Sequence, residues 1–132
     1  MNQSEALQNP RVIVVQKLYG HRLNKGSEIT FPKHRYKKFI KDVVNGTIER
    51  EELIQNLMDK ELKNDIKENK TDLMIKLMIM AAIYEFMFMH KTPVKVVINE
   101  YLKVADFFVQ KSQKGFLNAL LDKISKISRV QE

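Results

Sequence analysis

The sequence of 132 residues contains no cysteine, and its four glycines and three histidines are scattered along the chain. Without cysteine there is no disulfide and no thiolate ligand for a metal, which suits the reducing environment of the cytoplasm. Isolated glycines exclude a Gly-rich loop that cradles phosphates. The histidines form no helical H-x-x-x-H pair, so we expect neither a metal site nor a cofactor. These absences predict a protein that is not an enzyme.

A signal peptide and a long hydrophobic run are also lacking. Residues 1–10 are polar, without the basic start and apolar stretch that direct secretion. The most apolar segment, residues 73–89, is broken by Lys76 and Glu85 and is near the minimum length for a membrane span. We predict that it is the buried central helix of a bundle, with its five methionines filling the core. A cytoplasmic protein with no membrane partner is therefore expected.

The composition fits one small domain with an anionic partner. Hydrophobic residues make up 44% and charged residues 30%, and 132 residues suffice for one core, so we expect a single domain over residues 1–132. The formal net charge is +7. An excess of positive charge favours nucleic acid or an acidic protein surface as the partner.

The charge is unevenly distributed along the chain. Residues 11–25 carry four bases and residues 33–41 five, with no acid in either run. Residues 49–68 carry seven acids against four bases, and residues 107–126 carry four bases against one acid. A single run is typical of a solvated helix face. Convergence of two or three basic runs on one surface would instead indicate a nucleic-acid site, and the sequence leaves this open.

The apolar spacing predicts an all-α fold, a compact bundle of about six to seven helices. Asn9 and Pro10 mark the start of one helix, and residues 24–27 read as a loop. Residues 36–58 keep a helical period, although Asn45-Gly46 is a signal that can stop a helix. The period, together with the family resemblance given below, predicts one long helix with a weak point at Asn45-Gly46. Residues 63–70 are polar enough to be a connection.

Two further helices are expected in the last third of the chain. Thr92 is placed to cap the first of them, with Pro93 in its first turn. Ser112 is placed to cap the second. Between the apolar stripes of these two helices lies a short basic connector.

This connector, residues 107–116, is the best candidate for binding RNA. It interleaves Phe107, Phe108 and Phe116 with Lys111, Lys114 and Ser112. Single-stranded RNA exposes base faces that stack on aromatic rings, while its phosphates attract lysine and helix-start amides. The alternative is that the phenylalanines belong to the core and the lysines only solubilise a turn.

Four segments of the chain resemble motifs of the NusB family of transcription antitermination factors. Residues 11–19 are similar to the family pattern R-x-x-A-V-Q-A-L-Y, and residues 80–86 to R-L-A-L-Y-E-L. Residues 93–100 resemble P-x-K-V-A-I-N-E-A, and residues 115–123 resemble K-F-V-N-G-V-L-D-K. The resemblance extends from about Arg11 to Lys126, with the four motifs in the family's order.

The resemblance implies a helical bundle of two subdomains that binds RNA without catalysis. Its expected partners are single-stranded boxA-like RNA, the small-subunit ribosomal protein NusE and the RNA polymerase antitermination complex. By matching position, RNA contacts fall to Arg11, Tyr19, Phe108, Ser112 and Phe116. Together with Lys111 and Lys114 of the connector, these are the candidate RNA-binding residues.

The chain also departs from the family pattern. Residues 1–10 lack the family's arginine cluster, Met80 stands in place of an arginine, and Gly115 in place of a lysine. Lost phosphate contacts lower affinity for RNA. An alternative function is therefore a protein-interaction module of the same fold, as attached to some RNA methyltransferases, that has lost direct RNA recognition. The free-standing length favours the RNA-binding factor, and the lysines of residues 33–41 are candidates to replace the missing arginines.

Overall fold

The computed structural model describes residues 2–67 and 71–129. Over these residues the chain forms seven α-helices and no strand, which confirms the predicted all-α fold. The helices are α1 (Gln3–Gln8), α2 (Pro10–Leu23), α3 (Lys37–Glu49), α4 (Glu51–Leu62), α5 (Leu73–Phe88), α6 (Val94–Phe108) and α7 (Lys111–Ser128).

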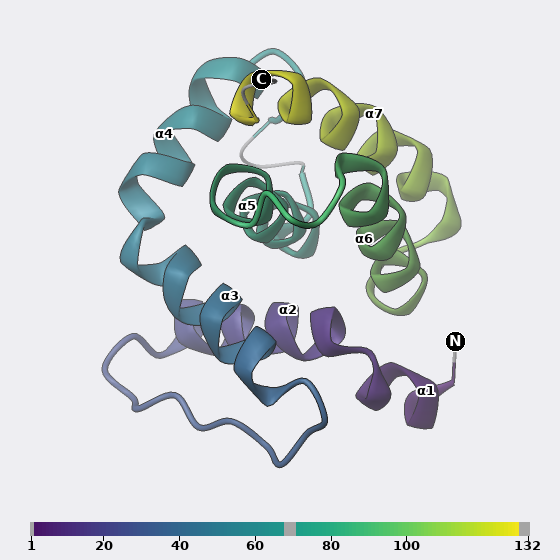
Figure 1. The fold of residues 1–132 in the computed structure, drawn as a ribbon. Helices are drawn as coiled ribbons and strands as arrows, with labels where there is room; N and C mark the ends of the chain where they lie inside the picture. Colours follow the sequence, from purple (N-terminus) through teal and green to yellow (C-terminus); the bar gives the residue numbers. More distant parts are fainter. Residues whose placement is uncertain (1, 68–70, 130–132) are drawn as a thin grey trace.

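Helix α5 is the centre of the bundle. It contacts α2, α3, α4, α6 and α7, and Figure 1 shows these helices arranged around it. Every residue from Leu77 to Ile83 is buried, as expected for a helix that is apolar on all sides. The predicted buried central helix is therefore confirmed. No helix within the described residues is both long enough and apolar enough to span a membrane.

Helix α2 begins as the sequence predicts. The side chain of Asn9 accepts a hydrogen bond from the backbone N–H of Arg11 at 3.0 Å, and Pro10 occupies the first helical position. A helix start leaves its first amide groups unpaired. The Asn9 side chain pairs one of them, and Pro10 has no N–H to leave unpaired. The valine-rich start, which favours a strand by local propensity, is helical because Val12 to Val15 are buried in the core.

The predicted single helix over residues 36–58 is wrong, because the chain forms two helices that separate at Arg50. α3 packs against α2 and α5, whereas α4 packs against α5 and α7. Both helices turn their apolar faces to α5, so the apolar period continues across a change in direction. Gly46 does not end α3; it is buried where the ring of Tyr84 packs directly against the helix backbone.

Two predicted helix caps are also wrong. α6 starts after Pro93, so Thr92 lies outside the cap position, and its carbonyl accepts a hydrogen bond from Arg129 instead. α7 starts after Gln110, which places Ser112 inside the first turn. Only Val109 and Gln110 separate α6 from α7, so most of the predicted connector is helical and α7 begins before Ser112. Of the predicted connection over residues 63–70, residues 63–67 are non-helical and 68–70 lie outside the described part of the chain.

Candidate nucleic-acid interface

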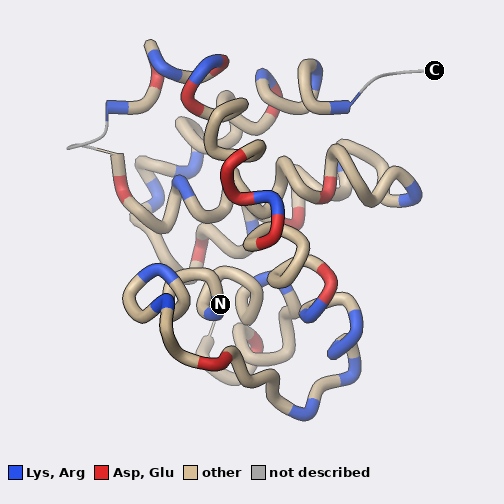
Figure 2. Tube along the Cα trace, turned by 90° about the vertical axis from the view of Figure 1, so that its left-hand side faces the viewer, with Lys and Arg blue, Asp and Glu red and all other residues tan. Residues whose placement is uncertain are grey.

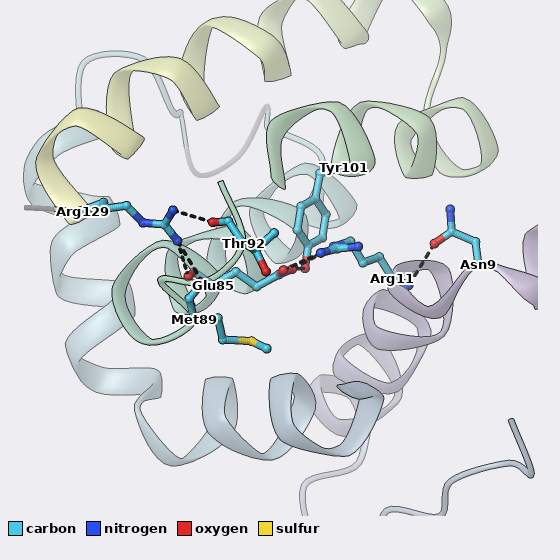
Figure 3. Close-up of polar contacts among 7 residues, drawn as sticks. All are labelled: Asn9, Arg11, Glu85, Met89, Thr92, Tyr101 and Arg129. Carbon is cyan, nitrogen blue, oxygen red and sulfur yellow. Dashed lines mark hydrogen bonds and ion pairs between the residues drawn. The ribbon is translucent and has the colours of Figure 1, made fainter. Parts of the chain in front are cut away.

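A buried ion pair and a hydrogen bond to it join three helices of the bundle. Arg11 of α2 donates from Nη2 to Glu85 Oε1 at 2.7 Å and from Nε to Glu85 Oε2 at 3.0 Å. Tyr101 of α6 donates its hydroxyl proton to the same Glu85 Oε2 at 2.5 Å. Figure 3 shows these side chains converging from α2, α5 and α6. Glu85 is the only carboxylate of α5, and both of its oxygens are bonded.

The surroundings fix the protonation of this cluster. Burial raises the pKa of Tyr101 well above its ordinary value, and the charge of Glu85 raises it further. Burial alone would lower the pKa of Arg11, but the hydrogen bond and charge of Glu85 hold it above its ordinary value. Arg11 therefore stays charged and Tyr101 neutral, and their hydrogen bonds to Glu85 tie α2, α5 and α6 together.

Arg11 is therefore placed in the interior and not on a surface open to RNA. It is 9% exposed, and its guanidinium lies over the ring of Phe39 at 4.7 Å. Its role as an RNA contact, carried over from the family pattern, does not fit this position, and we leave it out of the interface. Its partner is 74 residues away in the chain, so the sequence pattern could not show the pairing.

The remaining candidates at the α6–α7 junction lie on or near the surface. Phe116 is 39% exposed, although the neighbouring Leu117 is fully buried. Lys111 and Ser112 are exposed in the first turn of α7. Phe108 is half-buried, with its ring in edge contact with Phe107 at 4.9 Å. The junction thus presents an aromatic ring and an ammonium group at the start of one helix.

The charge of the junction is partly neutralised. Lys114 pairs with Asp106 at 2.9 Å, whereas Lys111 has no carboxylate partner among the described residues. The first amides of α7 receive no side-chain cap from Gln110. A helix start without a cap, next to an unpaired lysine, can accept a phosphate.

Tyr19 lies apart from this junction. It is exposed on α2, eight residues beyond Arg11, which is about 12 Å along the helix. At the other end of α2, the guanidinium of Arg11 lies 5.7 Å from the ring of Tyr101 on α6. The structure therefore brings Phe108, Lys111, Ser112, Lys114 and Phe116 to one place, but not Tyr19.

Comparison with known families decides the classification. The model of the NusB family matches residues 8–126. This chain belongs to the NusB family. The resemblance to the NusB family that the sequence motifs indicated is thereby confirmed over most of the chain.

Individual relatives agree with the NusB assignment. The chain is 32% identical over 94 residues to a transcription antitermination protein NusB of Rhodopseudomonas palustris (strain BisB5), which covers 71% of this chain and 54% of that protein. It is 31% identical over 104 residues to the protein of the same name from Rickettsia typhi, covering 79% of this chain and 65% of the relative. The match thus spans little more than half the length of the Rhodopseudomonas protein.

The fold is also that of a solved NusB. The structure of T. maritima NusB superposes with a TM-score of 0.77 at 21% identity, covering 90% of this chain and 89% of that one. At this level of identity the likeness concerns the fold alone. The predicted NusB-like bundle is confirmed.

Arg129 is a residue that sequence reasoning missed. Its guanidinium donates hydrogen bonds to the carbonyl oxygens of Glu85, Phe86, Met89 and Thr92, at distances between 2.5 and 3.2 Å. These carbonyls belong to the C-terminal end of α5 and to the turn that follows it, so Arg129 holds the two together (Figure 3). Partial burial lowers the pKa of Arg129 from its ordinary value, and the charge of Glu85 opposes the shift. No sequence motif signals this contact, because its partners are backbone atoms.

Replacing Arg129 with methionine is expected to destabilise the bundle by about 2 kcal/mol, because helix-end carbonyls lose charged hydrogen bonds. Urea unfolding followed by circular dichroism measures the change. Arg129→Lys retains the charge but not the fork of donors and should recover only part of the loss. A methionine variant as stable as the wild type would show that the clamp contributes nothing.

Metal binding has no support in the described part of the chain. Within residues 2–67 and 71–129, no three histidine, aspartate or glutamate side chains are grouped so that they could hold a metal ion. The geometry instead offers stacking, hydrogen bonding and positive charge, which are the means of binding nucleic acid.

Proposed function

We propose that this chain is a non-catalytic, cytoplasmic transcription antitermination factor that binds single-stranded boxA-type RNA together with ribosomal protein NusE. Residues 1–132 would act as a single RNA-binding domain within the RNA polymerase antitermination complex. Membership of the NusB family supports this function, as do relatives named transcription antitermination protein NusB. The partnership with NusE rests on the family alone.

The observation that carries RNA binding is the exposed ring of Phe116 in the second turn of α7, the helix that begins with the unpaired Lys111. An aromatic residue on an amphipathic helix normally faces the core, and on α7 that role belongs to Leu117, Leu120, Leu121 and Ile124. Phe116 lies off this buried stripe, so its ring face is available to a base. Lys111 and the first amides of α7 lie in the preceding turns and suit the adjoining phosphate.

A second function has some support from the same structure. Arg11 is paired with Glu85 and Lys114 is paired with Asp106, so neither charge is free for a phosphate. Residues 1–10 contain no arginine. A NusB-fold protein-interaction module without direct RNA recognition would show this loss of phosphate contacts. The alternative predicts binding to a protein partner but not to RNA.

Fluorescence anisotropy with a labelled boxA-like RNA, measured with and without NusE, separates the two functions. The RNA-binding factor binds boxA-like RNA more tightly than a scrambled RNA of equal length, and NusE increases the affinity. If neither RNA binds in the presence or absence of NusE at low salt, the interaction module is the correct function.

Lys111→Ala is expected to weaken RNA binding and to lower the slope of log affinity against log salt by about 0.7, the loss of one phosphate contact on a single strand. The measurement is a series of anisotropy titrations at increasing salt. Lys95→Ala removes the same charge from an exposed position on α6, away from the junction, and is the matched control. Equal slopes for the two variants would exclude Lys111 from the interface.

A further inference from the structure

Two basic runs of the sequence meet in the structure at a second surface. A groove between α1, α2 and the loop that joins α2 to α3 is bordered by Lys17 from the first run and by Lys33 from the second. The groove also has apolar walls, formed by Leu7, Ile13 and Phe31. Figure 2 shows basic positions following the lower edge of the molecule, where this loop leads into α3. We call Lys17, Lys33, Arg35, Tyr36, Lys37 and Lys41 the loop surface.

The charge of the loop surface is uncompensated. Among the five bases of residues 33–41, only Lys38 pairs with a carboxylate in the described part of the chain, that of Asp42 at 3.0 Å. The basic run over residues 107–126 differs, because three of its four lysines are paired. Their partners are Asp106, Asp65 and Asp122, bound by Lys114, Lys123 and Lys126. Within the described residues, the run over residues 33–41 therefore keeps four unpaired bases, against one in the run over residues 107–126.

Aromatic rings lie between these cations. Tyr36 is 47% exposed, and the guanidinium carbon of Arg35 lies 5.4 Å from the centre of its ring. The backbone N–H of Tyr36 donates to Nδ1 of His34 at 2.9 Å, which fixes the turn that presents the ring. The ammonium of Lys41 lies 5.9 Å from the ring of Phe31. Rings interleaved with cations are the composition of a surface that stacks bases and holds phosphates.

We propose that the loop surface is a second binding site for single-stranded RNA, separate from the α6–α7 junction. Lys17, Lys33 and Lys37 hold phosphates, and the ring of Tyr36 stacks on a base. The contact is tolerant of base sequence, because stacking and phosphate binding read no base edge. The exposed ring favours RNA over an acidic protein or an anionic lipid, which need only charge. The inference rests on the proposed RNA binding and adds a second position along the strand.

The test compares two triple variants with an RNA of about 20 nucleotides. Lys17→Ala combined with Lys33→Ala and Lys37→Ala is expected to lower the slope of log affinity against log salt by about 2, three phosphate contacts at about 0.7 each. Lys60→Ala combined with Lys63→Ala and Lys67→Ala removes the same charge from exposed positions in the acidic segment and should leave the slope near that of the wild type. Circular dichroism confirms that both variants are folded.

Tyr36 provides an independent readout. Tyr36→Ala should weaken binding about fivefold to a hundredfold, while Tyr36→Phe, which keeps the ring, binds like the wild type. The proposal is overturned if the two triple variants have equal slopes and Tyr36→Ala binds normally. It is also overturned if the loop variant loses binding to phosphatidylserine vesicles or polyglutamate while its RNA binding is unchanged.

Failure here is distinguishable from failure of the proposed function. If the loop variants bind RNA like the wild type while Phe116→Ala weakens binding, only the second site is excluded. Weakened binding by the loop variants, with no effect of Phe116→Ala or Lys111→Ala, keeps the loop surface and removes the junction as the RNA site.

Discussion

Glu85→Ala is expected to lower the free energy of unfolding by about 3–5 kcal/mol, a large part of the total stability of a small domain. The substitution leaves Arg11 charged and buried without its carboxylate, and it removes the acceptor of the Tyr101 hydroxyl. Both groups then carry an uncompensated cost of burial. Urea unfolding monitored by circular dichroism gives the free energy directly.

The matched control replaces the pair together. Arg11→Met combined with Glu85→Leu removes both charges and fills the same space with apolar atoms, so it should be much more stable than Glu85→Ala alone. The double variant should also bind RNA close to the wild-type level, since Arg11 lies outside the interface. Wild-type stability of Glu85→Ala would contradict the buried ion pair, and strong loss of RNA binding by a folded double variant would return Arg11 to the RNA site.

Phe116→Ala is expected to weaken binding of boxA-like RNA by about 1–3 kcal/mol, the contribution of one base stacked on an aromatic ring. Because the ring is exposed, the loss of stability should be small compared with that of a buried phenylalanine. Stacking is less sensitive to salt than a phosphate contact, so the weakening should persist at high salt, unlike that of Lys111→Ala.

Anisotropy titrations at low and high salt measure both properties of Phe116→Ala. Ile127→Ala removes another apolar residue exposed on α7, about three turns further along the helix, and serves as the control. If folded Phe116→Ala and Ile127→Ala both bind like the wild type, no base stacks on Phe116.

The sequence predicts the helices well where local chemistry decides them. Asn9 and Pro10 are residues that favour a helix start by themselves, so the start of α2 can be predicted locally. A helix that is apolar on all sides, as α5 is, can be buried only at the centre of a bundle. The break at Arg50 could not be predicted in the same way. The apolar spacing continues through it because α3 and α4 both face α5, and only their different neighbours turn the chain.

The candidate site is less accessible from sequence, because a residue's partners can be distant in the chain. The pairs Arg11–Glu85 and Lys123–Asp65 join residues 74 and 58 positions apart. Such pairs decide which charges remain free. The family pattern therefore placed Arg11 on the RNA, while the structure uses it inside the bundle. The sequence also could not predict that Lys17 and Lys33 line one groove, because this depends on the path of the loop between α2 and α3.

Nuclear magnetic resonance with isotopically labelled protein and boxA-like RNA tests the central claim most directly. If the α6–α7 junction binds RNA, the amide signals of Lys111 and Ser112 and the ring signals of Phe116 should shift progressively as RNA is added, reaching a limit at saturation. The signals of the exposed face of α4, including Leu53 and Asn56, should stay in place. Saturable RNA binding that leaves the junction signals unmoved would contradict this account.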